Sequence, residues 1–192
     1  PMTLGYILKL SQIQITDVVL DLACASGYTT AILSRLAKKV YGIDDNKLFL
    51  DQDMQYSCAY FHNPNMSLDQ AQKDKKQHII KKLQITENMD VLDIGCGWGG
   101  MALEIARQSQ YEVTGISLSE NQIGYCKKKA KELKMDNQVN FKLCDYRMVK
   151  GKFHRIVSVG AFEHFGKKFY KNFFKKIHNI MTDDGICLLH TI

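Results

Sequence analysis

The sequence has no apolar run near the about 18 residues that a membrane-spanning helix needs, and its N-terminal segment does not read as a signal peptide. It also has no CxxC pair, although it contains six cysteines: Cys24, Cys58, Cys96, Cys126, Cys144 and Cys187. The scattered cysteines exclude the usual zinc spacings and argue against a disulfide scaffold, so we expect a reducing, cytoplasmic environment. A hydrophobic share of 45% excludes a largely disordered chain.

The length of the chain limits the number of domains, and its net charge indicates the kind of partner. Its 192 residues are enough for one globular domain, or one domain plus a fragment. The formal net charge is +6, with +1 over residues 1–44 and +5 over residues 45–192. A modest positive field favours an acidic partner, either an anionic membrane surface or nucleic acid, and does not choose between them.

Hydrophobic periodicity predicts strands alternating with helices. The expected strands are 18–22, 40–43, 91–94, 112–117, 139–143, 155–160 and 186–191. The expected helices are 3–13, 28–37, 68–83, 100–108, 120–134 and 167–181. This alternation is typical of an α/β fold, a parallel sheet with helices on both faces.

The chain contains an internal echo that divides it into two parts. Residues 19–27 align with residues 91–99, 72 positions later, and residues 40–44 align with 113–117. Two complete nucleotide-binding sheets do not fit in 192 residues. We therefore expect a partial βαβ segment over residues 1–44 and a methyltransferase-like domain over residues 45–192.

The second copy carries a glycine loop between a strand and a helix. The loop reads Asp93-x-Gly95-x-Gly97-x-Gly99, and glycine there allows a tight turn and a close approach to a bound adenosine moiety. This spacing predicts S-adenosylmethionine binding; the alternative is a tight turn without a ligand.

The first copy departs from this pattern in the opposite way. It has Ala23 and Ala25 in place of glycines but keeps Asp44, an acid suited to ribose hydroxyls, where the second copy has Ser117. It is either a second cofactor loop or a packed remnant.

Several motifs in order resemble the cyclopropane-fatty-acyl-phospholipid synthase family, which includes mycolic acid cyclopropane synthases. They lie at residues 56–61, 68–75, 93–100, 117–122, 145–147, 155–160, 162–166 and 188–192. The resemblance runs from about Lys47 to Ile192. Residues 1–44 instead resemble protein-L-isoaspartate O-methyltransferases, in which Gly27 and Tyr28 follow the glycine loop.

The resemblance implies a class I S-adenosylmethionine-dependent methyltransferase fold, Rossmann-like and C-terminally truncated, because the family continues through further strands. The activity it implies is transfer of a methylene to the cis double bond of unsaturated phospholipid acyl chains, forming a cyclopropane ring. The implied cofactor-binding residues are Tyr56, Ser57, Gly95, Gly97, Ser117, Leu118 and Gln122, with Tyr146 in a loop expected beside the adenine. The implied catalytic residues, which hold a bicarbonate base in the family, are Cys58, Glu163, His190 and the backbone of Ile192; no metal is expected.

The expected partner is an anionic membrane surface, which places the chain in the cytoplasm, peripheral to the inner face of the membrane, without nucleic acid. An open sheet edge allows a homodimer, although no residue predicts one. Two alternatives stay open: an isoaspartate methyltransferase activity, and a cofactor-binding fragment without turnover. Helix 167–181 has an aromatic stripe among lysines, which favours packing on the sheet over lying on a membrane.

Overall fold

The computed structural model describes residues 18–22, 39–43, 50–63, 65–109 and 112–191, in two compact units, Pro1–Phe49 and Leu50–Ile192. In the first unit, strand β1 (Val18–Leu22) pairs in parallel with β2 (Lys39–Ile43). The two predicted strands are confirmed. Helices 3–13 and 28–37, Ala23, Ala25 and Asp44 lie outside the described residues.

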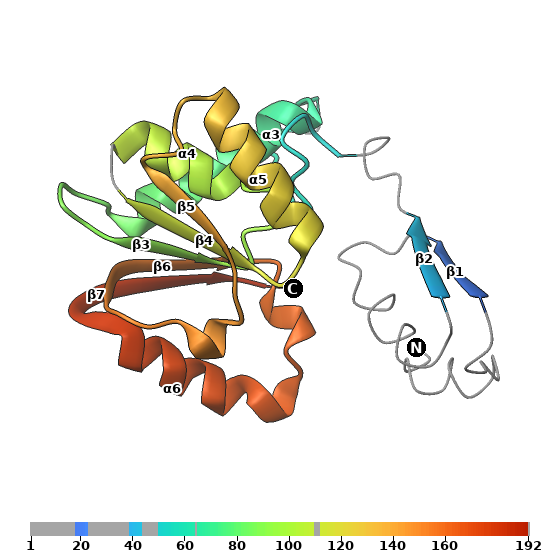
Figure 1. Cartoon of the computed structure of the whole chain (residues 1–192). Coiled ribbons are helices and arrows are strands. Elements are labelled where there is room, and N and C mark those ends of the chain that lie inside the picture. The colour runs from blue at the N-terminus through green and yellow to red at the C-terminus, as the bar shows by residue number, and fades with distance from the viewer. Residues whose placement is uncertain (1–17, 23–38, 44–49, 64, 110–111, 192) are drawn as a thin grey trace. The chain divides into compact units, whose positions relative to one another are not determined.

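The second unit is built on a five-stranded parallel sheet with strand order β5-β4-β3-β6-β7 (Figure 1). Its strands are β3 (Val91–Ile94), β4 (Val113–Ser117), β5 (Val139–Leu143), β6 (Phe153–Val159) and β7 (Met181–His190). All four residues of the central strand β3 are buried. Such a continuous buried run is typical of parallel sheets covered on both faces.

Helices cover both faces of this sheet, as the sequence predicts. Helices α3 (Leu68–Leu83), α4 (Gly100–Ser109) and α5 (Glu120–Glu132) lie on one face, and α6 (Tyr170–Ile180) lies on the other (Figure 1). Short 3-10 helices η2 (Tyr146–Met148), η3 (Phe162–His164) and η4 (Lys167–Phe169) lie in the connections. Serine caps start two of the long helices, because Ser67 Oγ and Ser119 Oγ accept hydrogen bonds from the backbone of Gln70 and Gln122.

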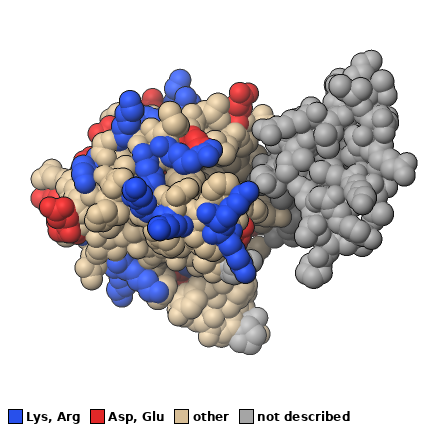
Figure 2. All heavy atoms as spheres, turned by 90° about the horizontal axis from the view of Figure 1, so that it is seen from below, with Lys and Arg blue, Asp and Glu red and all other residues tan. Residues whose placement is uncertain are grey.

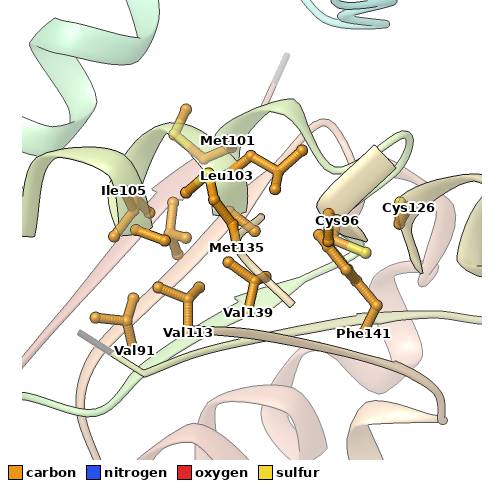
Figure 3. Close-up of a cluster of buried hydrophobic side chains, with 14 of the residues drawn as sticks. Val91, Cys96, Met101, Leu103, Ile105, Val113, Cys126, Met135, Val139 and Phe141 are labelled. Atoms are coloured by element: carbon orange, nitrogen blue, oxygen red, sulfur yellow. The ribbon is translucent and has the colours of Figure 1, made fainter. Parts of the chain in front are cut away.

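The two faces bury different side chains. The core under α3, α4 and α5 is mainly aliphatic and sulfur-containing, with Val91, Met101, Ile105 and Cys126 among its members (Figure 3). Phe141 is the one aromatic side chain among its described buried residues. The core under α6 combines aliphatic side chains with a group of aromatic rings that includes the buried Phe162 and Phe173. Phe173, Ile177 and Ile180 form the buried stripe of α6, which confirms that this helix packs on the sheet.

Several predicted boundaries need correction. The predicted helix 167–181 is a 3-10 turn followed by α6, which ends at Ile180, and helix 120–134 ends at Glu132. Strand β7 begins at Met181 rather than 186, because Met181 pairs with Phe153 and the register shifts before Arg155. This irregularity accommodates the polar residues 182–185 inside a strand, where their composition predicts a loop.

Candidate functional site

The glycine loop lies at the carboxyl end of β3, between Gly95 and Gly99. Its three odd-numbered glycines have φ of +78°, +54° and +87°, which favours glycine. The backbone N–H groups of Gly95 and Cys96 both donate to Ile116 O at 2.9 Å, which ties the loop to the end of β4. A Cβ on Gly97 would meet nothing within 4 Å, whereas one on Gly95 would lie 2.5 Å from Ala161 Cβ. Gly95 thus permits close packing, and Gly97 faces open space.

The floor of the loop is made by side chains of α5 and β5. A Cβ on Gly99 would lie 2.9 Å from both Cys126 Sγ and Phe141 Cζ, and the Cys126 thiol donates to Gly97 O at 3.4 Å. The pKa of Cys96 is well above its usual range, first because of its hydrogen bond with Cys126 and then because of burial. Figure 3 shows Cys96, Cys126 and Phe141 at the same end of the core. The loop therefore rests on neutral, closely packed groups.

Asp93 places a carboxyl group within the core, just before the loop. Its side chain is 2% exposed, and no described residue hydrogen-bonds its Oδ2. Burial raises its pKa to about 7, because a charged carboxylate loses its hydration in an apolar interior. Asp93 belongs to the glycine-loop motif in the sequence, but the motif alone does not indicate that its carboxyl group is buried, and Asp93 is not among the predicted site residues.

A second part of the site follows β4. Ser117 Oγ donates to Gln122 Oε1 at 2.7 Å and accepts from the backbone N–H of Ser119 at 3.2 Å. The S-x-x-Q sequence therefore forms only half of a capping box: Ser119 caps α5, while the Gln122 side chain reaches Ser117 instead. Leu118, between them, is 74% exposed. Three of the predicted cofactor residues, Ser117, Leu118 and Gln122, are thus grouped at one point of the edge.

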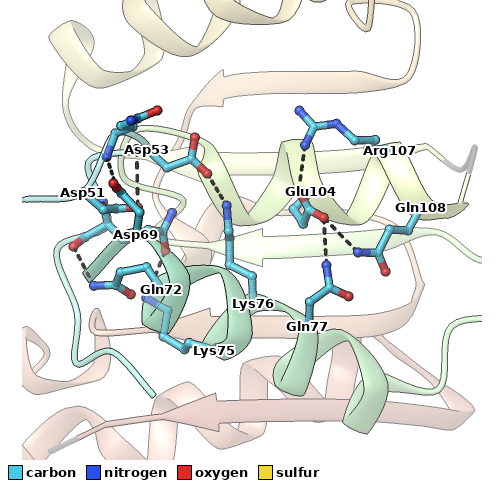
Figure 4. Close-up of polar contacts among 12 residues, drawn as sticks. Asp51, Asp53, Asp69, Gln72, Lys75, Lys76, Gln77, Glu104, Arg107 and Gln108 are labelled. Carbon is cyan, nitrogen blue, oxygen red and sulfur yellow. Dashed lines mark hydrogen bonds and ion pairs between the residues drawn. The ribbon is translucent and has the colours of Figure 1, made fainter. Parts of the chain in front are cut away.

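The third part is an extended segment held by α3. Lys75 Nζ donates to Ser57 Oγ at 2.7 Å and to Gln55 Oε1 at 3.1 Å, and Gln72 Nε2 donates to Ser57 O at 2.9 Å. Lys75 is 3% exposed, and burial lowers its pKa to about 8, with the Asp51 carboxylate opposing the shift. Figure 4 shows Gln72 and Lys75 on the side of α3 that meets this segment. Neighbouring Lys76 forms an ion pair with Asp53.

Gly160 joins this segment to the carboxyl ends of β6 and β7. A Cβ on Gly160 would lie 3.3 Å from Ser57 Cβ and 3.6 Å from Tyr56 O. The Gly160 N–H donates to His190 O at 3.1 Å. Residues 56–57, the start of the 160–169 connection and the end of β7 therefore meet, although they are far apart in the sequence.

The predicted catalytic residues lie next to this junction. Cys58 follows Ser57 and is exposed, and Glu163 lies in η3, three residues after Gly160. His190 Nδ1 is buried without a hydrogen-bond partner in the described part of the chain. Ile192 lies outside the described residues. The junction thus brings a carboxyl group, an imidazole and a thiol to one edge of the sheet.

Tyr146 lies in η2, after β5, and its ring stacks on Phe165 with centroids 4.9 Å apart. It also meets Phe173 edge-on at 5.3 Å. Burial raises the pKa of Tyr146. Because of these ring contacts, Tyr146 belongs to the aromatic group that supports the 160–169 connection. The adjacent Arg147 instead forms an ion pair with Asp145, with 2.6 Å between Nη2 and Oδ2.

The sequence prediction did not include the residues that hold the site together. Lys75 and Gln72 lie in the motif at residues 68–75, but no local pattern distinguishes them from the exposed Gln and Lys side chains of the same helix, so their burial could not be predicted. Gly160 ends a predicted strand, but its packing against Ser57 depends on a contact across more than 100 residues. Such contacts have no local sequence pattern.

The assembled groups can bind a polar molecule at the carboxyl edge of a parallel sheet, where ligands of this architecture bind. The open face of Gly97 leaves room, and the Ser117–Gln122 pair offers hydroxyl and amide groups. The buried Asp93 oxygen and His190 nitrogen are polar atoms without partners among the described residues. Unpartnered buried polar atoms are uncommon in folded proteins and call for an explanation such as a ligand.

Comparison with known proteins identifies the family of this chain. Residues 33–192 match the family described as mycolic acid cyclopropane synthetase. The chain is 40% identical over 148 residues to a probable fatty acid methyltransferase of Pseudomonas putida, covering 76% of this chain and 38% of that protein. It is also 40% identical over 158 residues to the S-adenosylmethionine-dependent methyltransferase UmaA of Mycobacterium tuberculosis, covering 81% and 55%.

Among solved structures, the chain is similar to mycolic acid cyclopropane synthase CmaA1 complexed with SAH and CTAB. The TM-score is 0.72 with 36% sequence identity, over 76% of this chain and 51% of that one. The chain thus spans about half the length of these relatives, or less. The family match begins at residue 33, before the boundary at 44/45, which stays a prediction together with the resemblance assigned to residues 1–44. By sequence and by fold, the chain belongs to the mycolic acid cyclopropane synthetase family.

Proposed function

We propose that this chain carries the cofactor-binding part of an S-adenosylmethionine-dependent enzyme that forms cyclopropane rings on unsaturated acyl chains. The observation that carries the proposal is the open space at Gly97, in a loop that is hydrogen-bonded to the end of β4 just before Ser117. The relatives support it, since they include a probable fatty acid methyltransferase and a cyclopropane synthase complexed with SAH.

The described residues fit the cofactor. The glycine loop admits a ligand at Gly97 without a Cβ in the way, and the Ser117–Gln122 pair can exchange its internal hydrogen bond for bonds to ribose hydroxyls. Exposed Leu118 provides an apolar surface for the adenine. We assign cofactor binding to Tyr56, Ser57, Gly95, Gly97, Ser117, Leu118, Gln122 and Tyr146.

Ser57 illustrates how the chain prepares this site. Its oxygen accepts a hydrogen bond from the Lys75 ammonium, so its own O–H is left to donate to a ligand acceptor, such as a carboxylate. Lys75 and Gln72 of α3 hold the Ser57 segment through hydrogen bonds, and Gly160 lets this segment approach the sheet. Because the Ser57 segment is already ordered, less conformational entropy is lost when a ligand binds.

When bound, the cofactor supplies an electrophilic methyl group. In the proposed reaction the π electrons of the alkene form the new C–C bond, the C–S bond breaks, and positive charge is left on the acyl chain. The aromatic rings around η3, such as Phe162 and Phe165, provide π faces near the junction that favour such a charge and exclude water. When the added methyl then loses one proton, the electron pair of the broken C–H bond forms the second C–C bond to the cationic carbon and closes the ring.

The finer proposal concerns the base that takes this proton. We place a bicarbonate between Cys58, Glu163, His190 and the Ile192 backbone. His190, whose buried Nδ1 has no partner among the described residues, and the Glu163 carboxyl group would hold this anion, which would supply a base for the proton. We further propose that the acyl chains are those of membrane phospholipids, which brings the reaction to a membrane surface.

A labelled-methyl experiment tests the proposal. The purified chain is given S-adenosylmethionine with an isotopically labelled methyl group, unsaturated phospholipid vesicles and an isoaspartyl peptide together, with saturated vesicles as the control. Mass spectrometry is expected to find one labelled methylene in the unsaturated lipid and none in the saturated lipid. Label in the peptide would assign the activity to residues 1–44 and contradict the proposal. Label in neither, with cofactor bound, would keep the assignment of cofactor binding and contradict ring formation by this chain.

A further inference from the structure

The positive charge of the chain is concentrated in one segment on the α6 side of the sheet. Residues 164–182 contain five lysines and no aspartate or glutamate. Since the net charge of the whole chain is +6, the remaining residues together are almost neutral. Figure 2, which looks at the side of α6, shows lysine and arginine spheres spread over this face, with acidic spheres mainly at its margins.

The exposed lysines lie opposite the buried stripe of α6. Phe173, Ile177 and Ile180 face the sheet, and a spacing of 100° per residue puts Lys171 and Lys175 on the opposite side. Lys167 and Lys168, in η4, are also exposed. Lys176 differs, because its Nζ donates to Val149 O at 2.6 Å. We call Lys167, Lys168, Phe169, Lys171, Phe174 and Lys175 the α6 lysine face.

The α6 lysine face has no internal charge compensation. None of its four lysines forms an ion pair with a described residue. Lys171 and Lys175 are four residues apart on one helix, and like charges at this spacing destabilise a helix. On α5, by contrast, Lys128 has Glu132 four residues later, at 4.0 Å. The arrangement therefore opposes helix stability and favours an external anion.

Aromatic side chains are exposed among these lysines. Phe174 is 51% exposed and Phe169 is 39% exposed, and Lys168 Nζ lies 5.0 Å from the centroid of the Phe169 ring. Lysines that meet anionic headgroups, with phenylalanines that enter the boundary of the acyl region, are typical of helices lying on membranes. A nucleic-acid surface is less well matched, because the segment has no arginine to bind phosphates bidentately.

The α6 lysine face begins at the candidate site. The connection from β6 passes through Gly160 and η3 before it reaches Lys167, and Phe162 in η3 stacks on Tyr170 at 4.2 Å and contacts Phe174 at 5.7 Å. From this placement we infer that the α6 lysine face docks on an anionic lipid bilayer. This inference rests on the proposed function, which needs acyl chains, and assigns the surface that delivers them to the site.

Vesicle sedimentation tests the inference with two variants of equal charge. In one, Lys167, Lys168, Lys171 and Lys175 are all changed to Gln; in the control, the exposed Lys127, Lys128, Lys131 and Lys134 at α5 are changed to Gln. All eight side chains are exposed, so both variants should fold, and circular dichroism checks this. The vesicles are phosphatidylglycerol mixed with phosphatidylcholine, or phosphatidylcholine alone.

We expect the unmodified chain and the α5 variant to bind the phosphatidylglycerol vesicles, and salt to weaken the binding. The α6 variant should lose about three orders of magnitude in partitioning, because each of its four lysines contributes about 1 kcal/mol near an anionic surface and about 1.4 kcal/mol corresponds to a factor of ten. Equal binding by the two variants, or binding of single-stranded RNA in place of vesicles, would overturn the inference. Affinity for S-adenosylhomocysteine, measured on the same samples, separates this outcome from failure of the proposed function, since the docking variant should keep it.

Discussion

The two faces of the five-stranded sheet are built from different residues and serve different parts of the site. On the α3–α5 face, an aliphatic and sulfur-rich core reaches the glycine loop through Cys126 and Phe141. On the α6 face, an aromatic core supports the 160–169 connection through Phe162, Phe165 and Tyr146. The first face positions the loop proposed to bind the cofactor, and the second positions the residues proposed to meet the acyl chain.

The difference extends to charge. Helix α5 mixes Lys and Glu, whereas the segment that includes α6 carries lysines without acids. Mixed charges suit a solvated surface, and charge of one sign suits a charged partner. Because the proposed cofactor and acyl-chain roles fall on different faces, substitutions on one face should spare the role of the other.

The largest expected effect comes from Gly97→Leu. The side chain would enter the open space over the loop, where no other atom lies within 4 Å, so S-adenosylhomocysteine binding should be lost. The positive φ of +54° strains any side chain at this position, so circular dichroism checks that the fold persists. Titration calorimetry measures the affinity. Gly151→Leu is a matched control, because Gly151 also has positive φ and open space but lies after η2. Equal affinities in the two variants would show that Gly97 does not face the cofactor.

Phe173→Ala should destabilise the chain most among changes on the α6 face. Phe173 is fully buried and touches the rings of Tyr146, Phe162, Phe165 and Phe174. We expect urea denaturation to show a loss of about 3–5 kcal/mol, as for other buried Phe→Ala changes. Half-exposed Phe174→Ala should lose much less. Similar losses would mean that the aromatic core is not organised around Phe173.

Asp93→Asn should change the pH dependence of stability. The folded chain keeps a proton on Asp93 up to about pH 7, which the unfolded chain releases near the ordinary pKa of 3.8. Between these values the native state binds more protons, so the free energy of unfolding falls as pH rises, by about 2–4 kcal/mol. Asparagine should abolish this fall, and exposed Asp136→Asn should not. Parallel pH profiles for both variants would contradict the account.

The smallest of these effects is expected for Lys75→Met. Methionine keeps most of the buried length but removes the donors to Ser57 and Gln55, so the segment that carries Tyr56 is held less firmly. We expect about a tenfold loss of S-adenosylhomocysteine affinity, the value of one hydrogen bond to a charged group. Exposed Lys73→Met on the same helix is the control. An unchanged affinity would remove the Ser57 segment from the site.

Much of the fold could be predicted because its signals are local. Strands β3 and β5 and helix α3 have the predicted bounds, since short apolar runs and the Ser67 cap mark them directly. Strand β7 was predicted too short, because Met181 extends it through pairing with Phe153. That pairing depends on the neighbouring strand, and Asp183, Asp184 and Gly185 locally favour a turn.

The site was predictable only in its parts. The glycine spacing identified Gly95 and Gly97, and the resemblance supplied Ser57 and Gln122. The interactions that organise them, such as Lys75 to Ser57 and Ser57 to Gly160, join residues distant in sequence. The unpaired oxygen of Asp93 likewise follows from three-dimensional burial, which no spacing reveals.

Hydrogen exchange with and without S-adenosylhomocysteine tests the central claim most directly. The account predicts that the ligand slows amide exchange at Gly95–Gly99, at 117–122 and at 56–57, and leaves residues 23–27 unchanged. Protection at 23–27 instead, or no protection at the Gly95–Gly99 loop, would contradict the assignment of the cofactor to the second glycine loop.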